Sequence, residues 1–327
     1  MKKITFIILV IITVFSCEKS TDTGRSVNTS FNHKILESYL VQSIAFDSKG
    51  NAWISTYKKG LIKYNSNETI VFDSTNSLIT SKTHLLDIVI DSKDNIWVGS
   101  YEGLIKYDGK SFTRFNSSNS PMSNDFIWHI AADSKDNIWI SCVNDLLKYD
   151  GTTFVVYPLT KYLAEPAIQG IAVDKEDNVW LSSSFYIDEC SLIKVVDSTF
   201  TVYSEKELGF SPYYLGGIAV NSKNQPYFVI SYIWGDPLSD QRPQLFTFDG
   251  TKSTQFQIDK ESVPWSVMID NEDNIWCYGL FGFLAIYNGQ NWITGYTKFK
   301  DLGISTIQQS PDKHIWVGTS YGIYIND

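Results

Sequence analysis

The sequence has few of the residues on which most catalytic and metal sites depend. Among its 327 residues are 4 cysteines, 4 histidines and three arginines. No cysteine pair has Cys-x-x-Cys spacing and no cysteine–histidine set has the spacing of a zinc site, so we expect no metal and no cofactor. Besides Cys17 near the N-terminus, an odd number of cysteines remains, which we expect to be mostly buried structural residues: Cys142, Cys190 and Cys277.

Beyond the first residues the sequence has no long apolar run, so we do not expect the protein to span a membrane. The stretch from Ile4 to Phe15 is apolar, follows the basic pair Lys2-Lys3, and is too short to cross a bilayer as a mature helix. These are features of a targeting segment, which is removed before folding.

Val14-Phe15-Ser16-Cys17 resembles the cleavage box of a bacterial lipoprotein. The resemblance implies a signal peptide over 1–16 and a lipid on Cys17, and therefore an exported protein anchored in the cell envelope, in the outer membrane by expectation. A plain secretory signal with an incidental cysteine is the alternative. We expect the polar residues 17–28 to form a flexible tether.

The net charge limits the classes of partner that the protein is expected to bind. The net charge is −9, which argues against nucleic acid, and against anionic lipid bound through a general field. Membrane contact is therefore expected through the N-terminal lipid alone. A hydrophobic content of 43% with 15% aromatic residues is ample for an ordered core.

One segment, Asp91-Ser92-Lys93-Asp94-Asn95-Ile96-Trp97, returns along the chain in seven copies at steps of 40–49 residues. A repeat of that length made of short strands is typical of a β-propeller. The other copies are Asp47–Trp53, Asp133–Trp139, Asp174–Trp180, Asn221–Tyr227, Asp270–Trp276 and Ser310–Trp316.

The second copy predicts four strands per repeat. Leu85 to Ile90 is the inner strand, Ile96 to Gly99 the second, Leu104 to Tyr107 the third and Ser111 to Phe115 the fourth. Asp108-Gly109 predicts the last hairpin. The fourth turn position should need positive φ, and it holds Gly50, Asp94, Asp136, Asp177, Asn224, Asp273 and Lys313.

The two ends of the chain complete one another. The seventh repeat stops at Tyr321 to Ile325, its third strand, and Thr29 to Ile35 can supply the fourth. Such closure removes exposed sheet edges. We therefore predict an all-β, seven-bladed β-propeller of four-stranded antiparallel blades over 29–327.

The repeat from Ile88 to Gly109 resembles the two-component regulator propeller repeat and is similar, more loosely, to the repeats of streptogramin lyases. The likeness covers about 41–325. In the regulator family such propellers are the periplasmic sensors of hybrid kinases that detect oligosaccharides. The chain ends at Asp327 with no kinase, so the likeness implies the fold and a glycan-binding habit, without signal transduction.

The enzyme classes suggested by these likenesses fit less well. Streptogramin lyases are metal-dependent and use histidine at the channel mouth of the propeller. Of the four histidines here, His84 and His129 are the two expected near blade entrances. Sialidases need three arginines, and one of the three here, Arg25, lies in the predicted tether. Asp87 and His129 are weak candidates for an orienting carboxylate and a base, although polar lining of a wet channel explains them equally. They belong to a ring of equivalent positions: Ser43, Asp87, His129, Gly170, Gly217, Ser266 and Thr306.

Aromatic residues gather where the second strand meets the third and where the inner strand begins. On one face these rings suit the apolar faces and hydroxyls of sugars, and equally a peptide, although single rings could simply pack between blades. The predicted ligand residues are Tyr57, Tyr101, Trp128, Tyr186, Tyr213, Trp234, Trp265, Phe281 and Tyr321.

Two loops exceed the length of the others, at 182–190 and 230–243. Long loops often carry function, so they place the predicted ligand on blades four and five; decorative insertions are the alternative. We predict a binding or interaction module for a glycan or peptide in preference to an enzyme. The alternatives are a metal-dependent lyase or hydrolase, and a scaffold for an envelope protein partner.

Overall fold

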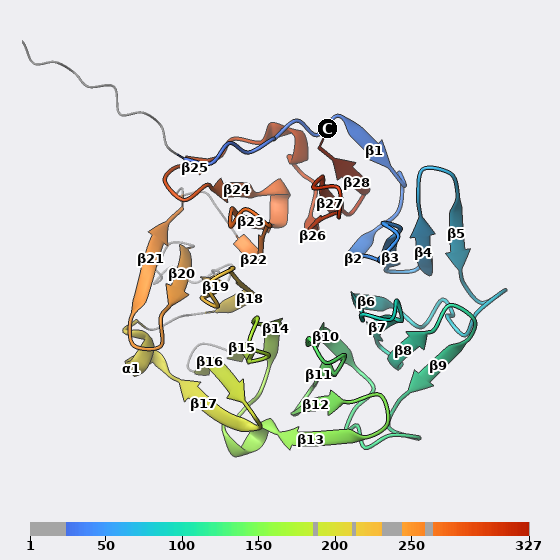
Figure 1. Cartoon of the computed structure of the whole chain (residues 1–327), viewed down its shortest axis with the longest axis horizontal. Coiled ribbons are helices and arrows are strands. Elements are labelled where there is room, and N and C mark those ends of the chain that lie inside the picture. Colours follow the sequence, from blue (N-terminus) through green and yellow to red (C-terminus); the bar gives the residue numbers. More distant parts are fainter. Residues whose placement is uncertain (1–23, 186–188, 211–213, 231–243, 259–263, 327) are drawn as a thin grey trace, which may run out of the picture.

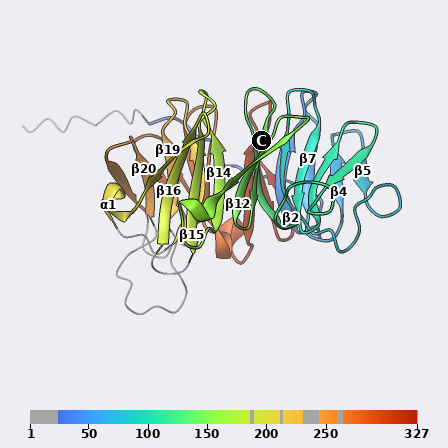
Figure 2. The same ribbon diagram turned by 90° about the horizontal axis from the view of Figure 1, so that it is seen from below.

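Seven four-stranded antiparallel sheets surround one central axis (Figure 1). The structure is a computed structural model that describes residues 24–326 except 186–188, 211–213, 231–243 and 259–263. Figure 2 shows the ring edge-on. The predicted seven-bladed β-propeller is confirmed.

Blades one to four follow the chain, and the first strand of each lies nearest the axis (Figure 1). Blade one is β2 (Val41–Phe46), β3 (Ala52–Thr56), β4 (Leu61–Tyr64) and β5 (Thr69–Phe72). Blade two is β6 (Leu85–Ile90), β7 (Ile96–Ser100), β8 (Gly103–Tyr107) and β9 (Phe112–Phe115). Blade three is β10 (Ile127–Ala132), β11 (Ile138–Cys142), β12 (Asp145–Tyr149) and β13 (Phe154–Pro158). Blade four is β14 (Ile168–Val173), β15 (Val179–Phe185), β16 (Glu189–Val196) and β17 (Thr199–Tyr203).

The last three blades include the one that joins the chain ends. Blade five is β18 (Leu215–Val220), β19 (Pro226–Ile230), β20 (Gln244–Phe248) and β21 (Ser253–Gln257). Blade six is β22 (Pro264–Ile269), β23 (Ile275–Gly279), β24 (Leu284–Tyr287) and β25 (Trp292–Ile293). Blade seven is β26 (Ile304–Gln309), β27 (Ile315–Thr319), β28 (Gly322–Ile325) and β1 (His33–Ile35).

Helices are short and lie in the connections: η1 (Leu159–Lys161), α1 (Glu205–Leu208), η2 (Leu280–Gly282) and η3 (Thr297–Phe299). Within the described part of the chain, no helix is long and apolar enough to cross a membrane.

The turn between the first two strands follows its sequence signature. All seven residues at the fourth turn position have positive φ, including Lys313 at 73°. In blade three the leading carboxylate, on Asp133, accepts hydrogen bonds from the backbone N–H of Lys135 and Asn137. It also accepts one from the indole N–H of Trp139, at 3.1 Å. Blades one, two, four and six repeat this Asp-to-Trp bond, so each of these turns is joined to the core that its Trp enters.

Neighbouring blades are joined through the same turns. The Asp94 carboxylate of blade two accepts from the backbone N–H and hydroxyl of Ser48 in blade one, at 2.8 and 2.6 Å. Asp136 and Asp177 bind the serines of blades two and three in the same way. The links continue through Asn224 with Lys175, Asp273 with Ser222, and Gln309 with Asn271.

The link cannot form between blades seven and one. The donor position of blade seven is Pro311, which has no N–H, and the acceptor position of blade one is Gly50, which has no side chain. Closure at this junction therefore depends on other contacts.

These turn-to-turn links predict a dependence of stability on pH. Hydrogen bonds from the backbone N–H groups of Ser92 and Ser134 lower the pKa of Asp136 and Asp177, respectively. A carboxyl whose pKa is lower when folded contributes stability above its unfolded pKa of about 4, and that stability is lost as the pH falls further. We expect the free energy of unfolding to drop between about pH 5 and pH 2, and to drop less in an Asp136→Asn/Asp177→Asn variant.

Urea unfolding at several pH values measures this effect. Asn tolerates positive φ and is the natural residue at position 224, so the variant should keep the turns. An identical acid loss in both proteins would show that these carboxylates are not responsible.

The core consists of clusters that lie between adjacent blades rather than in one centre. Trp97 of blade two, 2% exposed, packs with Ile127, Ile138 and Leu147 of blade three. The three cysteines in the propeller, Cys142, Cys190 and Cys277, are free and buried. Burial raises the pKa of each thiol, so they are poor nucleophiles, as expected of structural residues.

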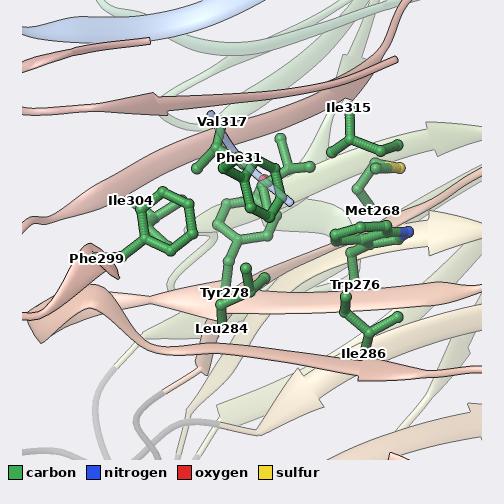
Figure 3. Close-up of a cluster of buried hydrophobic side chains, with 11 residues drawn as sticks. Phe31, Met268, Trp276, Tyr278, Leu284, Ile286, Phe299, Ile304, Ile315 and Val317 are labelled. Atoms are coloured by element: carbon green, nitrogen blue, oxygen red, sulfur yellow. The ribbon is translucent and has the colours of Figure 1, made fainter. Parts of the chain in front are cut away.

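The N-terminal segment closes the ring over two blades. Strand β1 pairs antiparallel with β28, and Phe31 just before it is 2% exposed in a cluster between blades six and seven (Figure 3). Phe31 packs edge-on against Phe299 with ring centroids 5.2 Å apart. Figure 1 shows the segment running along the outside of β25 toward β1.

Residues 24–28, which the sequence assigned to a flexible tether, instead contact the propeller. The Arg25 guanidinium donates to the Asn274 side chain at 2.9 Å and to the Asp273 carbonyl at 2.6 Å. Val27 packs against the cluster around Phe31. Residues 24–28 are therefore docked on the propeller, because blade six offers them hydrogen-bond acceptors and apolar surface; residues 17–23 lie outside the described part.

Candidate functional site

A β-bulge interrupts every inner strand close to its N-terminal end. A bulge inserts one extra residue and redirects the side chains around it. The bulges contain the ring of equivalent positions predicted from the repeats. In blades four and five this ring holds Gly170 and Gly217, and a Cβ added to Gly217 would lie 2.0 Å from the Ser266 hydroxyl oxygen of blade six. In blades one to three the ring holds the polar side chains of Ser43, Asp87 and His129.

Asp87 is the centre of that polar group. Its carboxylate accepts the Ser43 hydroxyl of blade one at 3.0 Å, the backbone N–H of Ile88 at 2.9 Å, and the N–H of Ile130 in blade three at 3.1 Å. Asp87 thus bridges three blades. This arrangement suits a structural acceptor, because each carboxylate oxygen is already engaged.

His129 lies beside Asp87, as expected of adjacent blades, but the two are not paired as a base and its orienter. The Nδ1 atom of His129 is 3.9 Å from the Asp87 carboxylate, beyond hydrogen-bond distance. Burial lowers the pKa of His129, and the Asp87 carboxylate opposes that shift. Within the described residues no group of three or more His, Cys, Asp or Glu could hold a metal ion.

A continuous line of rings crosses blades one to three on the face formed by the second-to-third-strand loops. It comprises Tyr57, His84, Tyr101, Phe126 and Trp128, and we call it the aromatic arc. Ring centroids along it are 4.5 Å apart from Tyr57 to His84, 5.0 Å from His84 to Tyr101, 4.1 Å from Tyr101 to Phe126 and 4.8 Å from Phe126 to Trp128. Trp128 at its inner end is 47% exposed.

Three of the predicted ligand residues, Tyr57, Tyr101 and Trp128, therefore belong to one surface. Its other two members, His84 and Phe126, were not among them. Both occupy the residue directly before an inner strand, and the same position holds Leu40 and Tyr214. Comparing that position across the repeats could have found them, because it carries a ring in three blades.

Trp265 occupies the same place in blade six that Trp128 occupies in blade three. It is 48% exposed and lies 5.6 Å from the Tyr214 ring, measured between centroids. The Tyr214 hydroxyl donates to the Gln169 side chain of blade four at 2.5 Å, and burial raises its pKa to about 12. This pair is separate from the aromatic arc.

The remaining predicted ligand residues fall into two groups. Phe281 in η2 and Tyr321 after β27 are 61% and 59% exposed, respectively. Tyr186, Tyr213 and Trp234, as well as the predicted lipidation site Cys17, lie outside the described residues.

The two long loops also need revision. The expected loop 182–190 is wrong in its extent, because β15 continues to Phe185 and β16 begins at Glu189. Ser183 pairs with Ser191, so most of this stretch extends a hairpin. In blade five, Ile230 ends β19 and 231–243 lie outside the described residues.

No protein-family model and no curated protein matches the chain. Solved structures do. A streptogramin B lyase is 15% identical with a TM-score of 0.69, over 91% of this chain and 96% of that one. The extracellular domain of the hybrid two component system BT3049 from B. thetaiotaomicron is 18% identical with a TM-score of 0.68, over 90% of this chain and 41% of that one.

A third similar structure is YCF48 bound to D1 peptide, 11% identical with a TM-score of 0.68, over 90% of this chain and 95% of that one. Both kinds of protein that the repeat resembles are thus among the structural neighbours. At these identities the likeness shows the fold. The chain is a seven-bladed β-propeller of the architecture shared by streptogramin B lyase and the extracellular domains of two-component regulators.

Proposed function

We propose that this chain is an exported binding propeller whose ligand, a glycan, lies on the aromatic arc. The observation that carries the proposal is the continuity of the arc: five rings in contact across three blades, with Trp128 at the inner end 47% exposed. Scattered exposed rings are ordinary on a protein surface, whereas a contiguous set suits a ligand with several flat apolar faces.

A glycan fits this surface better than a flat apolar ligand. Sugar rings present C–H groups on one face and hydroxyls at the edge, so they pack on aromatic rings while their hydroxyls reach polar neighbours. The partly exposed His129 follows Trp128 in the chain and is such a neighbour, whereas Asp87 beside it is already engaged by three hydrogen bonds. We assign His129 to this binding surface rather than to a catalytic pair.

The structural neighbours support the setting of the proposal. BT3049 contributes an extracellular domain, which agrees with export, and YCF48 carries a bound peptide, which makes a peptide the main competing ligand. We further propose that Cys17 carries the lipid and holds the propeller at the outer membrane. The mass of the mature N-terminus tests the anchor: a free α-amino group on any other residue contradicts it.

A glycan array probed with the chain from Gly24 onward, which keeps every described residue, tests the ligand. We expect saturable binding that weakens about tenfold or more in Trp128→Ala, because a central aromatic anchor contributes much of the binding energy. Tyr162→Ala is the matched control, since Tyr162 is 42% exposed and lies after η1, away from the arc.

Three other results would overturn this assignment. Loss of binding in Trp265→Ala with Trp128→Ala unaffected would place the ligand on blades five and six. Binding of peptides without any glycan would replace the ligand class. No binding to either would leave a protein scaffold, to be sought among co-purified envelope proteins.

A further inference from the structure

Three lysines stand at the outer end of the aromatic arc. Lys58 and Lys59 follow β3, and Lys82 precedes β6; all three are exposed. The ammonium group of Lys58 lies 5.2 Å from the centroid of the Tyr57 ring, which itself contacts His84, two residues after Lys82. Loops of two adjacent blades thus carry Lys58 and Lys82 close in the chain to Tyr57 and His84, while the ammonium group of Lys59 lies 5.8 Å from the centroid of the Tyr39 ring.

None of the three lysines forms an ion pair with a described residue. The acidic groups nearby are engaged elsewhere. Glu102, next to Tyr101, accepts the Thr83 hydroxyl at 2.8 Å and lies 3.2 Å from the Arg114 guanidinium. Asp125, next to Phe126, accepts the backbone N–H of Ser117 at 2.7 Å.

The outer end of the arc therefore carries positive charge in a chain whose net charge is −9. Ammonium groups without a protein counter-ion interact favourably with a ligand's carboxylate or sulfate, and the repulsion between them is relieved when such a group binds. Aromatic rings and lysines side by side match a ligand that combines apolar ring faces with negative charge.

We propose, building on the proposed function, that the ligand is an acidic oligosaccharide. Its carboxylate or sulfate groups contact Lys58, Lys59 and Lys82, and its ring faces lie along the arc toward Trp128. Because three rings separate Tyr57 from Trp128, one sugar cannot reach both ends, so the ligand has several residues.

Isothermal titration calorimetry with defined probes tests this ligand class. The acidic probes are oligogalacturonate and hyaluronan oligosaccharides for carboxylates and heparin oligosaccharides for sulfates. Galactan, xylan and mannan oligosaccharides, together with methyl-esterified oligogalacturonate, are the neutral ones. We expect at least one acidic probe to bind at least tenfold more tightly than any neutral probe, and to bind more weakly as salt is raised.

Two triple variants separate the arc lysines from net charge. Lys58→Gln/Lys59→Gln/Lys82→Gln should weaken the acidic probe about tenfold, since each exposed ion pair contributes modestly. Lys110→Gln/Lys223→Gln/Lys252→Gln removes the same charge from turns on the opposite face and should leave affinity unchanged. Trp128→Ala should weaken the acidic probe as well, because the arc binds its ring faces.

The outcomes separate this inference from the proposed function. Equal or tighter binding of a neutral glycan overturns the acidic ligand and keeps the glycan-binding propeller. Acidic binding that is lost equally in both triple variants, or that survives Trp128→Ala, reflects unspecific charge and also overturns it. Failure of every probe to bind overturns both.

Discussion

Removing residues 24–38 is expected to leave a chain that aggregates and has no cooperative unfolding transition. The deletion takes away β1, so the edge of β28 loses its partner and can pair with other chains. It also takes away Phe31, whose loss alone is expected to cost about 3–5 kcal/mol, the usual range for truncating a buried aromatic ring. Thermal unfolding by circular dichroism and size-exclusion chromatography, against the chain from Gly24, measures the effect.

Point variants and a peptide make this test specific. Phe31→Ala in the full chain should lower the free energy of unfolding by the stated amount. Arg25→Ala should lower it by about 1 kcal/mol, because its bonds to blade six are partly exposed. A peptide of residues 24–38 should restore the truncated propeller by adding the missing strand. A truncated chain that stays monomeric and melts with the intact one would show that the strand is dispensable.

Asp133→Ala should lower the free energy of unfolding by about 4 kcal/mol, because it leaves several buried donors without an acceptor. The Asp133 carboxylate, in a residue 8% exposed, accepts the Trp139 indole N–H and the backbone N–H groups of Lys135 and Asn137. It also accepts the Asn137 side-chain amide at 2.7 Å. Urea unfolding monitored by tryptophan fluorescence gives the difference directly.

Blade five provides the control for this variant. There Asn221 replaces the aspartate and Tyr227 the tryptophan, and Asn221 accepts two turn N–H groups, at 2.9 and 3.0 Å. Asn221→Ala should therefore cost about 1–2 kcal/mol. A double-mutant cycle with Asp133→Ala and Trp139→Phe isolates the bond to the indole. Strict additivity in that cycle would mean that the turn, and not the bond to Trp139, accounts for the loss.

The repeat made the fold predictable, because the conformation of each turn is determined by its own residues and does not depend on distant ones. Positive φ at the fourth position follows from Gly, Asn and Asp there, and Lys313 adopts it as well because its turn makes the same two backbone hydrogen bonds, between Ser310 and His314 and between Lys313 and Ser310. The constant spacing from Asp133 to Trp139 was equally visible, yet its meaning was missed. From the sequence, the aspartate is interpreted as a turn residue and the tryptophan as a core residue, and the spacing of six does not by itself indicate a hydrogen bond between them.

Contacts between repeats could not be predicted from the local sequence. The bond from Ser48 to Asp94 joins residues 46 apart, and neither has a feature that sets it apart from other turn residues. The hydrogen bond from Arg25 to Asn274 of blade six was equally unpredictable, since it joins residues 249 apart in the sequence. Such pairings depend on how the blades are rotated about the axis.

The candidate site was predictable in part. Tyr57, Tyr101 and Trp128 stood out because aromatic residues recur at fixed places in the repeat. That they form one surface with His84 and Phe126 depends on the loops before the inner strands, whose lengths differ between blades. Loop length therefore pointed to blades four and five, whereas the contiguous rings lie on blades one to three.

The missing link between Pro311 and Gly50 has a consequence for synthesis on the ribosome. Blade one emerges first, and each later blade can bond to its predecessor as it appears, so six junctions form in the order of translation. The seventh must wait for the last residues. Until then β1 has no partner strand and Phe31 has only the blade-six half of its cluster, so the N-terminal end of the nascent chain must stay free of non-native contacts for the longest time.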